Sequence, residues 1–126
     1  MISMRGFVLN AVCAAGLLAA APAAWAADAG QGEEVYAACA ACHGEKGAGT
    51  ETGPALAGIV GRKAAGVDGF RYSAAMKRSR ITWDAASLRE FIADPQGKVK
   101  GNRMPFDGLQ DAGQVDDLVA YLESLK

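Results

Sequence analysis

Five consecutive residues, Cys39-Ala40-Ala41-Cys42-His43, constrain this chain of 126 residues more than any other feature. They form a C-x-x-C-H run, the pattern through which c-type haem is attached to a protein. Each thiol can add across one vinyl group of the porphyrin, and the adjacent imidazole can then bind the iron from below. His43 is the only histidine in the chain, so no other imidazole competes for the metal. The run predicts one covalent haem c, with thioether links at Cys39 and Cys42 and His43 as proximal iron ligand.

The same cysteine spacing also occurs in redox dithiols of the thioredoxin type, in zinc sites and in plain disulfides. A thioredoxin-like dithiol lies in a βαβ setting, and no strand pattern precedes or follows Cys39. A four-coordinate zinc site needs more Cys or His ligands, and none follows His43. These two comparisons favour haem attachment over the other uses of the motif.

The first 26 residues have the pattern of an export signal. Arg5 is their only charge, an apolar run extends over residues 7–21, and Ala24-Trp25-Ala26 gives a small-x-small cleavage site. The residue before Cys13 is not Gly, Ala or Ser, so the lipoprotein cleavage pattern is missing and Cys13 should leave with the signal. We expect a signal peptide over residues 1–26 and a protein exported to the periplasm.

An uncleaved membrane anchor is the alternative for this segment. Residues 7–27 are uncharged and long enough to span a bilayer, but Asn10, Pro22 and many alanines make them only weakly hydrophobic. Cleavage leaves residues 27–126 as one small domain with 12 basic and 14 acidic residues. This balance excludes a strongly basic nucleic-acid binder, and the chain has no Gly-rich phosphate loop. A porphyrin would enlarge the modest core that 100 residues can bury.

Capping signals predict several helices separated by long loops. We expect them over residues 31–41 after Asp28, 73–77 at Ser73, 85–93 after Asp84 and before Asp94-Pro95, and after Asp111 with Gln114 in a capping box. The last helix has an apolar stripe made by Val115, Leu118, Val119, Leu122 and Leu125. No run has the length and alternation of a strand, so the predicted class is all-α. Packing on a porphyrin would organise the long loops.

Two methionines remain after cleavage as candidates for a sixth iron ligand. Met76 lies in a short helical segment, where an apolar side chain that fills a gap is the simpler interpretation. Met104 lies in an irregular loop between Gly101 and Pro105, where helical periodicity does not explain it and the proline stiffens the chain. The pattern favours Met104 as the ligand, although ordinary packing of a loop methionine stays open.

The chain resembles the class I cytochromes c, in particular bacterial relatives of mitochondrial cytochrome c. The resemblance covers nearly all of residues 27–126, in the segments Gly32–His43, Thr52–Lys63, Gly69–Ser73, Ile81–Trp83, Gly101–Phe106 and Asp117–Leu122. It implies a cytochrome c fold, with three main helices, short helices and long loops around one haem. It also implies that Met104 is the distal iron ligand.

The resemblance assigns further roles around the haem. The carbonyl of Pro54 would accept a hydrogen bond from the proximal imidazole and raise its basicity. Arg62, Tyr72, Trp83 and Asn102 match positions that bond to haem propionates or to ordered water nearby, where donors offset the cost of burying a carboxylate. Simple packing is the alternative for Tyr72 and Trp83, and a solvated charge is the alternative for Arg62. Tyr36, Leu118 and Tyr121 are better explained by helix packing.

Two departures from the mitochondrial pattern bear on function. Phe91 occupies the position of a tyrosine whose hydroxyl lies near the methionine sulfur, so we expect an altered midpoint potential. In those relatives a ring of lysines surrounds the exposed haem edge, and this chain has fewer basic residues there. Three positions that are often basic are occupied by Ala38, Gln96 and Gly97. A basic patch beside the Met104 loop is still formed by Lys98, Lys100 and Arg103. We therefore expect docking to redox partners to weaken with added salt, but less steeply than in the mitochondrial relatives.

A six-coordinate iron has no vacant position for a substrate, which favours an electron carrier over an enzyme. The resemblance implies a quinol-oxidising membrane cytochrome complex as electron donor. The acceptor would be a terminal oxidase, a photosynthetic reaction centre or another periplasmic reductase, and the carrier itself would be a monomer. The rival interpretation is a haem enzyme or sensor, such as a peroxidase or gas binder, whose distal ligand is labile.

Overall fold

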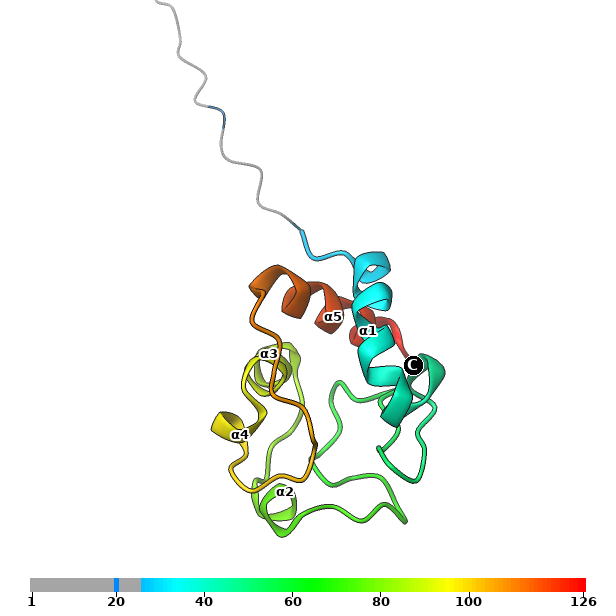
Figure 1. Cartoon of the computed structure of the whole chain (residues 1–126), viewed down its shortest axis with the longest axis vertical. Coiled ribbons are helices and arrows are strands. Elements are labelled where there is room, and N and C mark those ends of the chain that lie inside the picture. The colour runs from blue at the N-terminus through cyan, green and yellow to red at the C-terminus, as the bar shows by residue number, and fades with distance from the viewer. Residues whose placement is uncertain (1–19, 21–25) are drawn as a thin grey trace, which may run out of the picture.

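The computed structural model describes residue 20 and residues 26–126 (Figure 1). The predicted signal peptide therefore lies almost entirely outside the described residues. The described chain contains α1 (Ala29–His43), a 3₁₀ turn (Glu45–Gly47), α2 (Ala74–Arg78), α3 (Ala85–Ala93), α4 (Pro95–Lys98) and α5 (Ala112–Ser124). Within residues 26–126 the β-structure is limited to an isolated antiparallel bridge between Lys63 and Thr82. The predicted all-α class is confirmed. In this same range no helix is both long and apolar enough to cross a bilayer.

Aspartate side chains begin the three longest helices, as the sequence predicts. The carboxylate of Asp28 accepts hydrogen bonds from the backbone N–H groups of Gly30 and Gln31, at 2.7 and 3.2 Å. That of Asp111 accepts from the N–H of Gln114 at 2.9 Å. Each bond satisfies an amide that has no partner inside the first turn. In the described chain Gln114 does not return a side-chain bond to Asp111, so the cap of α5 is only half of the predicted box.

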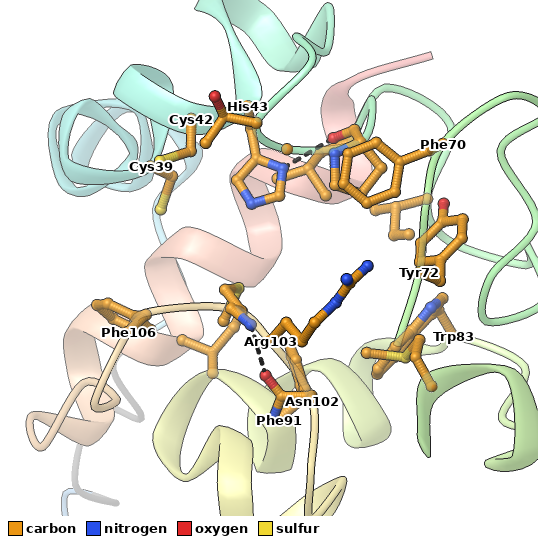
Figure 2. Close-up of a pocket in the computed structure, with 18 of the residues that line it drawn as sticks. Cys39, Cys42, His43, Phe70, Tyr72, Trp83, Phe91, Asn102, Arg103 and Phe106 are labelled. Atoms are coloured by element: carbon orange, nitrogen blue, oxygen red, sulfur yellow. Dashed lines mark hydrogen bonds between the residues drawn. The ribbon is translucent and has the colours of Figure 1, made fainter. Parts of the chain in front are cut away.

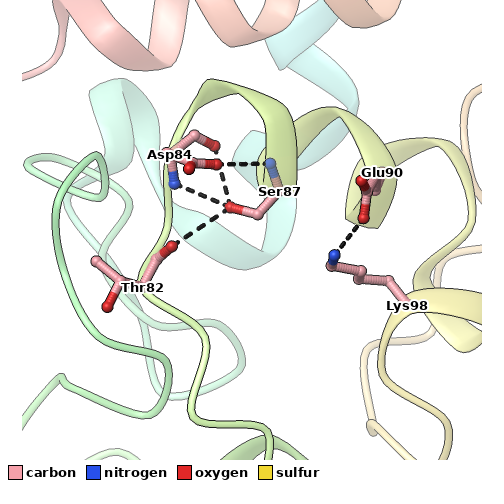
Figure 3. Close-up of polar contacts among 5 residues, drawn as sticks. All are labelled: Thr82, Asp84, Ser87, Glu90 and Lys98. Carbon is pink, nitrogen blue, oxygen red and sulfur yellow. Dashed lines mark hydrogen bonds and ion pairs between the residues drawn. The ribbon is translucent and has the colours of Figure 1, made fainter.

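A reciprocal capping box forms instead at α3 (Figure 3). Asp84 accepts from the N–H of Ser87 at 2.7 Å, and the Ser87 hydroxyl oxygen accepts from the N–H of Asp84 at 2.9 Å. Ser73 caps α2 in the simpler way by accepting from the N–H of Met76 at 3.0 Å. Both helices begin where the sequence predicts, because these signals act over a few residues.

Helix α4 is the element that the sequence analysis missed. Asp94-Pro95 does end α3, but Pro95 is also the first residue of α4, and the Asp94 carboxylate accepts from the N–H of Gly97 at 2.9 Å. Proline suits a first helical position because the N–H it lacks would have no partner there. An ion pair between Lys98 and Glu90 then joins α4 to α3 (Figure 3).

Helices α1 and α5 cross at close range (Figure 1). Gly32 of α1 is buried, and a Cβ atom at this position would lie 1.9 Å from the carbonyl oxygen of Asp117 and 2.8 Å from Cβ of Tyr121. One turn further along α1, the ring of Tyr36 packs on that of Tyr121 with centroids 5.2 Å apart. The predicted packing role of the two tyrosines is confirmed. Only glycine at residue 32 allows the two backbones to approach this closely.

The remaining elements leave a space beside this helix pair. Helix α3 packs against α5 and α4, whereas α2 packs against no other helix of the described chain. The loop segments over residues 44–73 and 79–84 likewise have little secondary structure of their own. Residues of α2 and of these loops line a cavity beside this helix pair.

We predict that Gly32→Ala destabilises the protein by about 2 kcal/mol or more, because α1 and α5 must separate to accommodate the methyl group. Gly30→Ala is the matched control in the same helix, since its Cβ would meet only the end of the exposed Asp28 side chain. Equilibrium unfolding of the haem-loaded protein in guanidinium chloride measures both. Equal stability of the two variants would contradict this account of the crossing.

Candidate haem site

A cavity of about 550 Å³ lies between the end of α1, the two long loops, α3 and α5 (Figure 2). Its lining is mainly apolar, and its volume is in the range of pockets that hold a cofactor. Every site residue predicted from the sequence lines it: Cys39, Cys42, His43, Pro54, Arg62, Tyr72, Trp83, Asn102 and Met104. Residues up to 65 positions apart in the chain are therefore brought to one cavity.

His43, the last residue of α1, points its ring into this cavity (Figure 2). Its Nδ1 lies 2.8 Å from the carbonyl oxygen of Pro54. Because a carbonyl can only accept, Nδ1 carries the hydrogen, and the lone pair of the neutral ring is on Nε2. Burial lowers the pKa of His43, and the bond to Pro54 opposes this in part. The ring is thus held neutral and oriented, the form in which histidine binds a metal.

The segment before Pro54 presses directly against the end of α1. The Thr50 hydroxyl donates to the carbonyl oxygen of Cys42 at 2.5 Å and accepts from the N–H of Thr52 at 3.0 Å. At Gly53 a Cβ atom would lie 2.7 Å from the Cys42 oxygen and 3.0 Å from Nδ1 of His43. The sequence analysis gave no role to Thr50 or Gly53. The signal available was Thr50, three residues before Gly53-Pro54, a spacing typical of hydroxyl-stabilised turns.

Cys39 and Cys42 lie on the last turns of α1, three residues apart and so on one side of the helix. Both are free thiols and half-buried. Burial raises the pKa of the Cys39 thiol, with a smaller contribution from Cys42. Figure 2 shows both sulfur-bearing side chains beside the His43 ring, so the three functional groups of the motif share one edge of the cavity.

The segment around Met104 lies on the far side of the cavity from this motif. Asn102, Arg103 and Phe106 are across from Cys39 and His43 in Figure 2. Met104 and Met76 both line the cavity and both are half-buried, so lining alone does not distinguish them. Met104 differs in that its N–H donates to Oδ1 of Asn102 at 2.9 Å, which attaches its backbone to a buried side chain.

Polar groups gather at the end of the cavity near Tyr72 and Trp83. The Tyr72 oxygen accepts from the N–H of Val67 at 3.1 Å and keeps its own hydrogen to donate. Trp83 is 5% exposed, and its indole N–H has no acceptor among the residues that the structure describes. Arg62 donates to the carbonyl oxygens of Ala55 and Ala57. This end therefore offers a hydroxyl, an indole N–H and a positive charge.

Phe91 lies beside this polar end, where the resemblance places a tyrosine. It is buried, lines the cavity, and packs on Trp83 with ring centroids 5.2 Å apart. Its ring contributes apolar contact and no hydrogen-bonding group. The cavity wall next to Trp83 therefore lacks the hydroxyl group that a tyrosine would place there.

The family model for cytochrome c matches residues 29–126, which is nearly the whole described chain. The chain belongs to the cytochrome c family. As a member it is an electron carrier rather than an enzyme, and it carries a single covalently attached haem c. The family also accounts for the mostly helical fold and for the large cavity within it.

Two relatives in this family are cytochromes c2. That of Blastochloris viridis is 44% identical over 104 residues, which are 82% of this chain and 81% of the relative. That of Rhodoblastus acidophilus is 44% identical over 102 residues, covering 80% of this chain and 95% of the relative. Among solved structures, cytochrome cH from Methylobacterium extorquens superposes with a TM-score of 0.73 at 46% identity. The match covers 77% of this chain and 98% of that one.

The residues around the cavity fit a haem c on structural grounds. Two free thiols and an oriented, neutral imidazole share one edge. The lining between them and the Met104 loop is mainly apolar, as a porphyrin face requires. Donors at Tyr72, Trp83 and Arg62 are placed to receive carboxylates.

We predict that Gly53→Ala costs about 2 kcal/mol or more of stability, because the new methyl group displaces the Pro54 segment from the end of α1. Gly58→Ala is the control: it has a positive φ of 72° but open space around its Cβ. It should cost only the strain of a left-handed backbone, about 1–2 kcal/mol. Guanidinium unfolding of the haem-loaded variants compares them. A loss at Gly53 no greater than at Gly58 would show that the approach to α1 is unimportant.

Proposed function

We propose that this chain is an exported, periplasmic single-electron carrier with a His/Met-ligated haem c. Cys39 and Cys42 would form the thioether links, and His43 and Met104 would bind the iron from opposite sides. The observation that carries this proposal is the His43 ring, whose Nδ1–H is bonded to Pro54 so that Nε2 faces the cavity. The loop that carries Met104 forms the opposite wall.

Each residue has a defined part in this proposal. Pro54 fixes the orientation and tautomer of His43 and raises its basicity. Met104 supplies a soft thioether, which favours the ferrous state and so a high potential. Tyr72 and Trp83 would donate to the propionates, and Arg62 would offset their charge. The bound haem supplies a one-electron couple at its iron. With His43 and Met104 both engaged, no coordination position is left for a substrate.

The charge distribution supports docking to acidic partners. Residues 62–103 contain ten Lys and Arg but four Asp and Glu, whereas the rest of residues 27–126 contains two and ten. Within the predicted basic patch, Lys98 is paired with Glu90, which reduces its contribution. Arg103 donates to the carbonyl oxygen of Arg71, so Arg71 adds an exposed cation that the sequence analysis did not include. The surface for partners would then centre on Lys100, Arg103 and Arg71.

The partners proposed from family likeness are membrane redox complexes of a respiratory or photosynthetic chain. The donor would be a quinol-oxidising cytochrome complex. The acceptor would be a terminal oxidase, a reaction centre or a periplasmic reductase. Export through cleavage after about Ala26 would deliver the carrier, as a monomer, to the compartment where these complexes meet. Mass spectrometry of the mature protein tests the cleavage site.

We predict that Met104→Ala abolishes the weak near-infrared charge-transfer band of the ferric protein and lets carbon monoxide bind the ferrous form. Met76→Leu is the matched control, because Met76 also lines the cavity. It should keep the band and keep carbon monoxide out. The reverse pattern would make Met76 the ligand. Rapid carbon monoxide binding by the unmodified protein would favour a gas-binding role with a labile distal ligand.

We predict that Lys100→Glu slows electron exchange with isolated membrane complexes about threefold or more at low ionic strength. The difference should vanish near 1 M salt, where the Debye length is about 3 Å. Lys126→Glu makes the same charge change outside residues 62–103 and should have little effect. Bimolecular rates against ionic strength measure both. Equal slopes for the two variants would refute a docking role for this patch.

A further inference from the structure

The side-chain amide of Asn102 makes all of its hydrogen bonds to backbone groups of residues 95–104. Its Nδ2 donates to the carbonyl oxygens of Pro95 and Val99, each at 2.9 Å. Its Oδ1 accepts from the N–H of Met104 at 2.9 Å. Asn102 is only 7% exposed, so these bonds are shielded from competing water. They join both ends of α4 to the loop that follows it.

These partners allow only one orientation of the amide. Carbonyl oxygens can only accept and a backbone N–H can only donate, so exchanging Oδ1 and Nδ2 would break all three bonds. Both amide hydrogens are therefore in use, and none is left to donate to a propionate or to nearby water. The role that the family resemblance suggests for Asn102 thus competes with bonds already made within the chain.

A second side chain ties the same loop to the same helix. Nε2 of Gln96, in α4, donates to the carbonyl oxygen of Asn102 at 2.9 Å, and its Oε1 accepts from the N–H of Gly101 at 3.0 Å. Gly101 has a φ of 91°, which lets the chain turn sharply between these attachments. The loop before Met104 is therefore attached to α4 by two side chains, that of Gln96 from the helix and that of Asn102 from the loop.

We propose that Asn102 is the positioning residue for Met104, and that α4 is the platform from which it acts. The bond from the Met104 N–H fixes the backbone from which the thioether projects, and the bonds to Pro95 and Val99 fix the amide itself. This inference rests on the proposed function, in which Met104 binds the iron. Asn102 acts through the backbone N–H of Met104, whereas Pro54 accepts directly from the imidazole ring of His43.

The test uses the haem-loaded ferric protein with imidazole as a competing ligand. Loss of the near-infrared band with added imidazole reports how readily Met104 gives up its position. In Asn102→Ala we expect at least about a tenfold tighter apparent imidazole affinity, since tenfold corresponds to about 1.4 kcal/mol, the order of one buried hydrogen bond. Asp111→Ala removes the exposed cap of α5 and should lower stability without changing imidazole affinity.

Two further measurements separate positioning from general stability. Asn102→Asp keeps the size of the side chain and one acceptor, but turns a carboxylate oxygen toward two carbonyls, so it should also weaken retention of Met104. In the unmodified protein the Met104 amide hydrogen should exchange with solvent at least about tenfold more slowly than in either variant.

The outcomes distinguish this inference from the proposed function. Wild-type imidazole affinity in both Asn102 variants overturns the inference, as does a Met104 amide that exchanges at the unprotected rate in the unmodified protein. In either case a near-infrared band in the unmodified protein would leave the proposed ligation intact. Absence of that band in the unmodified protein would instead overturn the ligation itself.

Discussion

The close crossing of α1 over α5 at Gly32 is the constraint on which the rest of this structure depends. Because Gly32 has no side chain, the backbone of α1 lies directly against the carbonyl of Asp117. The last turn of α1 carries the cysteine pair and His43, while Leu118 and Leu122 of α5 form part of the cavity wall. The distance between the attachment motif and that wall therefore follows from how closely the two helices approach.

Beyond this helix pair, the buried core residues Leu88, Phe91 and Ile92 of α3 also line the cavity, so the core and the cavity adjoin. Helix α2 has no helical partner in the described chain, and its Met76 faces the cavity. Trp83 and Phe91 pack on each other at the edge of the same space. A domain of about 100 residues buries a limited apolar area, so a covalently held haem is a structural element of this fold as well as its redox centre. The long loops, which would weaken an ordinary domain, enclose it.

Local signals explain what could be predicted from the sequence. The haem motif is a run of five residues, and the caps Asp28, Ser73 and Asp84 act within one helical turn, so no knowledge of tertiary contacts was needed. Asp94-Pro95 was ambiguous for a physical reason, since the same dipeptide ends one helix and begins another.

The features that could not be predicted depend on tertiary placement. An asparagine amide can serve a cofactor or the backbone, and the carbonyls of Pro95 and Val99 decide this for Asn102 only once α4 has formed. The approach of Gly53 to His43 and the contact of Arg103 with Arg71 likewise join segments that the sequence keeps apart. The motif and the family resemblance together named the residues that line the cavity and the bond from His43 to Pro54, but the partners of Asn102, Thr50 and Arg103 had to come from the structure.

The separation of charge described above gives the molecule an electric dipole. The acidic helices α1 and α5 lie at one end of the fold in Figure 1, α2 lies at the other, and α3 and α4 lie between them; these last three helices belong to the basic segment. In the field of an anionic surface, such a dipole experiences a torque that rotates the molecule before contact. A chain with a net charge near zero can thus still arrive with one end foremost, which raises the fraction of collisions that are productive without tightening the complex that follows.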